Sequence, residues 1–497
     1  MRLTLDTSKL DDYRTFLRIK RLPNYRFIGR VAEFPDEYAH MVTGSDVRAK
    51  LPDYQPSEFL FDYQKDIARM AVVKNKYAIF ADCGLGKTLM FLDWAKYVLS
   101  VLPDDRRILM VSPLMVVDQT AEECERWYGD TLPLDVVKAA DLADWTAGRT
   151  GKARLGITNF EALREDVPQG CLAGMIVDES SMLKSHYGAW GREILRLGRG
   201  LRWKLAGTGT PAPNDRIEYA NHAVFLDAEP NVNAFLARYF VNRGEKANRW
   251  EIKPHAIEPF YRGLSHWSIF LTNPATYGWR DHSTDIPPID VHIEHVPLTD
   301  DQIAAIQNET GQLFATHAGG IGTRSRLGQI AKGTCRGETI DTRKPNYIRR
   351  MAERWPEEQT IIWCLYNAEQ DQIAATFGEA AASMDGQTPY DQRKKQIADF
   401  KAGRVRTLIT KPRILGFGLN LQCATRQIFS GLQDSYEQYY QAVKRSNRVG
   451  STRKLNVHIP VTDAERPMIE TVLDKADRVQ ADAEAQERIF KEHAYGW

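Results

Sequence analysis

The feature that most constrains this chain is a glycine-rich loop at residues 81–88, Ala-Asp-Cys-Gly-Leu-Gly-Lys-Thr. It follows the apolar run Ala78–Phe80 and precedes Leu89–Leu99, which has a helical pattern. Strand, glycine-rich loop and helix together form a P-loop, in which backbone N–H groups and the helix N-terminus surround phosphates. Ala81 replaces the first glycine of the general pattern, but the flanking elements are those the loop requires. We therefore expect an α/β fold that binds a nucleoside triphosphate.

Each position of the loop has a predicted role. Lys87 supplies a positive charge to the phosphates, and the Thr88 hydroxyl is suited to ligate Mg²⁺ beside ATP. Upstream, Gln64 precedes an amphipathic helix, and its amide can both donate to and accept from an adenine edge. The predicted nucleotide-binding residues of the first lobe are Gln64, Asp82, Cys83, Gly84, Leu85, Gly86, Lys87 and Thr88, and Gly416, Gly418 and Asn420 are predicted to bind the nucleotide from the second lobe.

Short apolar runs recur along the chain, each ahead of a helical stretch. Strands that are apolar throughout, separated by helices, indicate parallel sheets covered on both faces. One set of runs is 77–81, 107–112, 155–158, 175–178 and 204–206, and a second is 360–364, 407–410, 427–430 and 457–459. We therefore predict two α/β lobes, each a parallel sheet flanked by helices.

The composition between these sets divides the chain further. We predict an N-terminal accessory region over 1–60, a first lobe over 61–285 and a second lobe with a C-terminal helix over 351–497. Residues 286–350 are expected to hold a linker, marked by Pro287-Pro288, and a helical, basic insertion.

Two adjacent carboxylates, Asp178 and Glu179, end the strand that begins near Met175. Phosphoryl transfer relies on charge neutralisation and on an oriented nucleophile. We expect Asp178 to hold Mg²⁺ and Glu179 to orient and deprotonate the attacking water. Thr208 and Thr210, on the turn after the next strand, are expected to relay the state of the γ-phosphate.

The second lobe contains a glycine-rich segment followed by a cationic one. Gly416, Gly418 and Asn420 precede Gln441, Arg445 and Arg448, whose i, i+4, i+7 spacing would place them on one face of a helix. An arginine face that meets ATP across a cleft would stabilise charge on the γ-phosphate. All three are predicted to be catalytic; a surface salt-bridge ladder is the alternative.

Residues 319–350 carry eight basic side chains against Glu338 and Asp341. Contact with nucleic-acid phosphates is one interpretation, and a solvated basic face is the other. The side chains chosen as candidate phosphate contacts are Arg324, Arg326, Lys332 and Arg336.

Composition excludes several classes of protein. The net charge is +1, and no run of about 18 residues is both apolar and uncharged, so no membrane span is expected. The six cysteines lie far apart without a Cys-x-x-Cys pair, which argues against a zinc site or disulfides. The first residues lack the layout of a secretory signal. We expect a cytoplasmic monomer, in a bacterial or phage-infected cell.

In order and spacing these motifs resemble the Swi/Snf-type group of helicase superfamily 2, from about Phe61 to Asp477. The motifs include 82–88 (motif I), 111–114 (motif Ia), 157–161, Asp178-Glu179, 208–211 (motif III), 416–421 (motif V) and 441–450 (motif VI). Ser180-Ser181 depart from the family pattern, which has a small residue followed by His.

The resemblance implies two RecA-like lobes with helical insertions between motifs III and IV. It further implies ATP hydrolysis that drives translocation on double-stranded DNA. From the size of the chain we expect a compact bacterial or phage-type protein that processes forks or recombination intermediates. Pro113, Thr158, Thr208 and Thr210 are then expected to contact the nucleic acid. The alternatives are a strand-separating DNA or RNA helicase, a nucleotide-dependent switch, and the motor subunit of a defence or restriction assembly.

Overall fold

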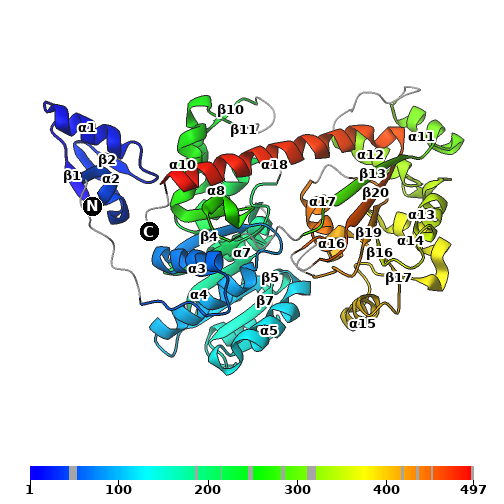
Figure 1. Cartoon of the computed structure of the whole chain (residues 1–497), viewed down its shortest axis with the longest axis horizontal. Helices are drawn as coiled ribbons and strands as arrows, with labels where there is room; N and C mark the ends of the chain where they lie inside the picture. Colours follow the sequence, from blue (N-terminus) through cyan, green and yellow to red (C-terminus); the bar gives the residue numbers. More distant parts are fainter. Residues whose placement is uncertain are drawn as a thin grey trace. The chain divides into compact units, whose positions relative to one another are not determined.

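The computed structural model describes residues 1–43, 53–184, 189–213, 215–244, 250–280, 286–310, 321–415, 419–432, 436–448 and 451–493. The chain divides into two units, residues 1–281 with 480–497 and residues 282–479, which are described separately below. Figure 1 labels many of the helices and strands of both units. Within the described residues, no helix is long and apolar enough to cross a membrane.

The first unit is built on a seven-stranded parallel sheet with the order β12-β4-β9-β8-β5-β7-β6. Its strands are β4 (Lys76–Ala81), β5 (Arg107–Ser112), β6 (Leu134–Val136), β7 (Leu155–Asn159), β8 (Leu172–Asp178), β9 (Trp203–Gly207) and β12 (Ser268–Leu271). The five predicted strands of this lobe are confirmed.

Side chains that alternate along these strands enter two separate cores. Ile79 and Met110 face the core that includes α3 (Asp62–Lys74), α4 (Lys87–Val101) and α5 (Leu114–Tyr128). Phe80 and Val111, the next residues along, face the core of α7 (Ala189–Gly198), α8 (Tyr219–Phe225), α9 (Val232–Tyr239) and α10 (Ile257–Trp267). The sheet is therefore covered on both faces, as its continuously apolar strands predicted. The remaining helix is α6 (Leu142–Thr146), and β10 (Phe240–Asn242) pairs with β11 (Trp250–Ile252).

A small N-terminal module precedes the lobe. It contains β1 (Arg2–Thr4), α1 (Leu10–Ile19), β2 (Arg26–Ile28), β3 (Val31–Glu33) and α2 (Ala39–Thr43), with its own antiparallel sheet. Two residues of the module contact the lobe. Glu37 forms an ion pair with Lys74 at 2.6 Å, and the Tyr38 hydroxyl is hydrogen-bonded to Nδ1 of His266 at 2.8 Å. Burial lowers the pKa of His266, although Glu37 opposes the shift.

The second unit contains a six-stranded parallel sheet with the order β13-β20-β19-β16-β18-β17. Its strands are β13 (Ile289–His295), β16 (Thr360–Trp363), β17 (Ala381–Ser383), β18 (Thr407–Thr410), β19 (Arg426–Phe429) and β20 (Leu455–Val461). The four predicted strands are confirmed. Residues 289–295, which we expected in a linker, instead form the edge strand β13 beside β20.

Helices surround this second sheet. They are α11 (Asp300–Thr310), α12 (Ile321–Ala331), α13 (Lys344–Glu353), α14 (Asn367–Phe377), α15 (Tyr390–Lys401), α16 (Pro412–Leu415) and α17 (Tyr436–Val443). A short hairpin of β14 (Thr334–Cys335) and β15 (Glu338–Thr339) follows α12. The last helix, α18 (Arg466–His493), contributes residues to both units.

The C-terminal part of α18 completes the core of the first unit. Phe490 is 1% exposed and packs edge-on against Tyr277 at 5.7 Å between ring centroids. Asp482 accepts hydrogen bonds from Arg216 and from the Tyr261 hydroxyl, at 3.0 and 2.9 Å. The first lobe therefore depends on residues about 200 positions beyond its last strand.

Candidate nucleotide-hydrolysis site

The P-loop lies between β4 and α4, as predicted. Gly84 and Gly86 have positive φ angles of 90° and 71°, which glycine adopts without the clash that a side chain brings. The backbone N–H of Asp82 donates to Leu271 on the neighbouring strand at 2.9 Å, which fixes the entry to the loop. Lys87, at the first position of α4, donates to the carbonyl of Ala81 at 2.7 Å.

Two side chains of α3 hold the other end of the loop. The Tyr63 hydroxyl and Nε2 of Gln64 both donate to the Leu85 carbonyl, at 3.1 and 3.2 Å. Oε1 of Gln64 accepts from the Phe61 N–H at 2.9 Å. Gln64 is thus buried under the loop, and its predicted role is to bind an adenine edge through its amide. That contact stays a prediction.

The carboxylates lie where β8 ends, on the edge of the sheet that also carries the P-loop. The Ser112 hydroxyl, at the end of β5, donates to Oδ2 of Asp178 at 2.9 Å. Burial, followed by the charge of Glu179, raises the pKa of Asp178 to about 6, against the opposing charge of Lys87. A cation at this carboxylate would offset the cost of burying its negative charge.

Glu179 stands on a strained turn. Its φ angle is 50°, a left-handed conformation that costs a residue with a side chain about 1–3 kcal/mol. Oε2 of Glu179 accepts a hydrogen bond from the Thr208 hydroxyl at 3.0 Å, and the backbone N–H donates to Asp178. The Thr208 hydroxyl therefore fixes the orientation of the Glu179 carboxylate. A carboxylate with a fixed orientation is suited to orient a water molecule.

The cationic residues of the second unit differ from expectation in their local structure. The prediction that Gln441, Arg445 and Arg448 share one helical face is wrong, because α17 ends at Val443. Arg445 and Ser446 donate to carbonyls three residues back, and the carbonyl of Arg445 accepts from Leu421. These tight turns end the helix.

These polar side chains are nevertheless buried, in whole or in part. Gln441 and Arg445 are each 2% exposed. Nη1 of Arg448 is buried and has no hydrogen-bond partner among the described residues, which leaves a donor for an anion. Asn420 forms a turn with Gln422, whose N–H donates to it at 3.2 Å. Gly416 and Gly418 lie outside the described residues.

The comparisons with known proteins agree with this geometry. Residues 63–247 match the model of the SNF2-related domain, and residues 343–450 match that of the helicase conserved C-terminal domain. The chain is a Swi/Snf-type ATPase of helicase superfamily 2.

Two similar proteins add detail. The chain is 22% identical over 450 residues to Zorya protein ZorD of Escherichia coli O139:H28 (strain E24377A / ETEC); the match covers 79% of this chain and 41% of ZorD. This ATPase therefore spans less than half the length of the curated relative that it matches. A Sulfolobus solfataricus SWI2/SNF2 ATPase core in complex with dsDNA is 18% identical, with a TM-score of 0.40 over 88% of this chain and 97% of that one.

For this Swi/Snf-type ATPase, sequence reasoning missed several residues that support the site. Ser112, Tyr63 and His222 contact motif residues or their immediate neighbours; Ser112 lies within motif Ia but was not chosen as a site residue, and His222 lies outside every motif. The one usable signal was Ser112, a hydroxyl residue at a strand end directly before Pro113. His222 lies 43 residues after Glu179 on α8, and no spacing rule pointed to it.

The predicted nucleic-acid contacts have mixed outcomes. The side chains of Thr158 and Lys332 are buried inside their own lobes, so the structure gives no support to these two contacts. Thr158 donates to the Val137 carbonyl at 2.8 Å, and Lys332 pairs with Glu465 at 2.5 Å. Thr208 is fully buried beside Glu179, Thr210 is 3% exposed, and Pro113 is partly exposed at the start of α5.

The arginines of the basic segment bind protein groups. Arg324 donates to the Pro467 carbonyl at 2.9 Å. Arg326 and Arg336 are largely exposed, and both pair with Glu309 at 2.8 Å. These two remain available to phosphate if the pairs open, so their contact with nucleic acid stays a prediction.

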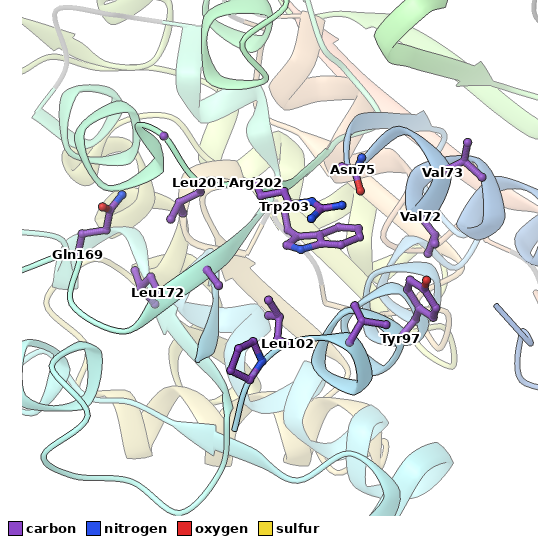
Figure 2. A pocket seen from close by; sticks show the side chains of 14 residues that line it. Val72, Val73, Asn75, Tyr97, Leu102, Gln169, Leu172, Leu201, Arg202 and Trp203 are labelled. Carbon is purple, nitrogen blue, oxygen red and sulfur yellow. The ribbon is translucent and has the colours of Figure 1, made fainter. Parts of the chain in front are cut away.

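A cavity of about 690 Å³ in the same lobe is separate from this site (Figure 2). It is lined by Asn75, Leu172 and Trp203, which lie at the starts of β4, β8 and β9. The P-loop and the carboxylates follow the opposite, carboxyl ends of these strands. The cavity therefore belongs to the far edge of the sheet.

Proposed function

We propose that this chain hydrolyses ATP to translocate on double-stranded DNA. The observation that supports the proposal is the arrangement of three candidate hydrolytic groups at one sheet edge of an SNF2-related domain: Lys87 in the loop, Asp178 held by Ser112, and Glu179 held by Thr208. A protein that only sensed nucleotide would not require an oriented base.

In the proposed cycle, the loop N–H groups and Lys87 bind the β- and γ-phosphates. The oxygen ligands Thr88 and Asp178 suit Mg²⁺, a hard cation that prefers oxygen donors and would neutralise phosphate charge. Glu179 orients the attacking water and accepts its proton. Arg448, with Arg445 and Gln441, meets the γ-phosphate when the lobes close, so that closure depends on the nucleotide.

Nucleic acid is proposed to bind across both lobes, chiefly through phosphates and therefore with little sequence preference. The experiment is steady-state ATPase with duplex DNA, single-stranded DNA and RNA, followed by displacement of a triplex-forming strand. We expect the largest stimulation with duplex DNA and ATP-dependent displacement, both lost in Lys87→Ala. Stimulation by RNA alone, or unwinding of a fork without triplex displacement, would replace the proposal with a strand-separating helicase.

One observation favours a second candidate, the motor part of a larger assembly. The matched region makes up 41% of ZorD, so a related segment lies within a longer chain. In that case turnover would stay near zero with every nucleic acid until a partner protein is added.

A further inference from the structure

A buried serine–histidine pair lies directly behind the carboxylates. Ser180 follows Glu179 in sequence, and its hydroxyl lies 3.0 Å from Nε2 of His222 on α8. Both side chains are completely buried. The bond therefore joins the carboxylate turn to a helix 42 residues away in sequence, without solvent between them.

The direction of this hydrogen bond follows from the other ring nitrogen. Nδ1 of His222 faces the carbonyl of Glu218 at 3.4 Å, and a carbonyl can only accept. Burial lowers the pKa of His222 to about 4, so the ring is neutral near pH 7 and carries one N–H. We assign that hydrogen to Nδ1, so that Nε2 accepts from the Ser180 hydroxyl.

The turn that this bond holds requires support. Glu179 has a φ angle of 50°, and such strain persists only where the surroundings constrain the backbone. Thr208 fixes the Glu179 side chain, but Ser180 is the next residue along the strained backbone. Releasing Ser180 would allow the turn to relax and the carboxylate to change direction.

His222 also contacts the strand that leads into the P-loop. Its ring packs edge-on against Phe80 at 5.1 Å between centroids, and Phe80 immediately precedes Ala81, the first residue of the loop. One side chain thus touches both the strand that leads into the P-loop and the turn that carries Glu179.

We propose that His222 is a positioning residue for ATP hydrolysis: by accepting the Ser180 hydroxyl hydrogen, it holds the turn that aims Glu179 at the attacking water. The inference rests on the assignment of Glu179 as the base. It goes beyond the proposed function because it assigns a role in hydrolysis to a residue outside every motif.

The test compares kcat and KM for ATP in four single variants and in the double variant His222→Leu/Ser180→Ala, each measured well below its melting temperature. His222→Leu removes the acceptor, His222→Gln places an amide oxygen near the position of Nε2, and Ser180→Ala removes the donor. Phe225→Leu is the packing control, since Phe225 is 1% exposed on the same helix.

We expect His222→Leu and Ser180→Ala each to lower kcat at least tenfold with KM within twofold. The double variant should lose no more than either single change, and His222→Gln should recover kcat to within about threefold of wild type. Phe225→Leu should lower the melting temperature and leave kcat nearly unchanged.

The proposal is overturned if Ser180→Ala keeps kcat within twofold of wild type, or if His222→Gln loses as much as His222→Leu. The conservative Ser180→Ala change keeps the test decisive even if His222→Leu does not fold. A fully active Glu179→Gln enzyme would instead remove the base assignment, which is a separate failure.

Discussion

Gly86 and Gln64 are in such close contact that a Cβ atom on Gly86 would come within 2.2 Å of Nε2 of Gln64. The same glycine has a φ angle of 71°, directly before the first residue of α4. The end of the P-loop is thus confined both by its own backbone conformation and by the side chain beneath it.

Gly86→Ala should therefore impair nucleotide binding. The left-handed conformation costs alanine about 1–2 kcal/mol, and the clash must also displace Gln64 or the loop. We expect ATP affinity to fall at least tenfold, measured by titration with a fluorescent analogue. Gly200→Ala is the matched control, because Gly200 has a φ of 75° with nothing within 4 Å of the added atom. Equal affinity in both variants would show that the contact with Gln64 is unimportant.

Arg448→Ala should separate binding from hydrolysis. An arginine that stabilises transferred charge can contribute on the order of 10³–10⁵ in rate, whereas the P-loop alone provides most of the ground-state affinity. We expect turnover to fall at least a hundredfold with ATP affinity within a few-fold. Arg404→Ala, an exposed arginine paired with Asp399, is the control. Wild-type turnover in Arg448→Ala would mean that this side chain does not reach the nucleotide.

A buried ion cluster in the second unit should be important for stability. Glu465 pairs with Lys332 and Lys344 at 2.5 and 2.6 Å, and all three side chains are at most 3% exposed. Glu465→Gln would leave two lysines facing a neutral amide, and breaking a buried pair costs about 3–5 kcal/mol. Chemical denaturation should show that loss, while exposed Glu379→Gln should change stability very little.

The same cluster gives a pH dependence. Although burial opposes the shift, the two lysines lower the pKa of Glu465 from 4.5 to about 2. A carboxyl with a depressed folded pKa contributes stability above its unfolded pKa and loses that contribution as pH falls towards the folded value. The difference in melting temperature between wild type and Glu465→Gln should narrow from pH 4.5 downwards. A constant difference would contradict this assignment.

The C-terminal helix should stabilise the first lobe. Phe490 belongs to the core that contains α3 and α4, so Phe490→Ala should cost about 3–5 kcal/mol. Exposed Lys491→Ala, one residue later, should leave the unfolding transition nearly unchanged. Similar stabilities of the two variants would show that the end of α18 does not complete this core.

The features that could be predicted from the sequence are those whose residues are adjacent along the chain. The run Ala78–Phe80, the glycines of the loop and the helix after Lys87 are adjacent in sequence, so strand, turn and helix propensities were sufficient to identify the P-loop. The strand ending in Asp178-Glu179 was equally local. The parallel sheets followed because nine apolar runs alternate with helical segments.

Long-range partners were not predictable. Lys332 was predicted to contact phosphate because it lies in a segment with eight basic side chains; its partner Glu465 lies 133 residues later. The spacing of Gln441, Arg445 and Arg448 suggested a helix, but tight turns begin after Val443. His222 is an ordinary helix residue until the fold places it against Ser180.

The account depends above all on Glu179 as the base, and a single-turnover measurement with Glu179→Gln tests this most directly. The hydrolysis of bound ATP would be measured by rapid quench in the presence of duplex DNA. We predict ATP affinity within a few-fold of wild type and a hydrolysis rate at least 10³-fold slower, since the amide occupies the same space but cannot take the proton. Hydrolysis within tenfold of wild type would contradict the account.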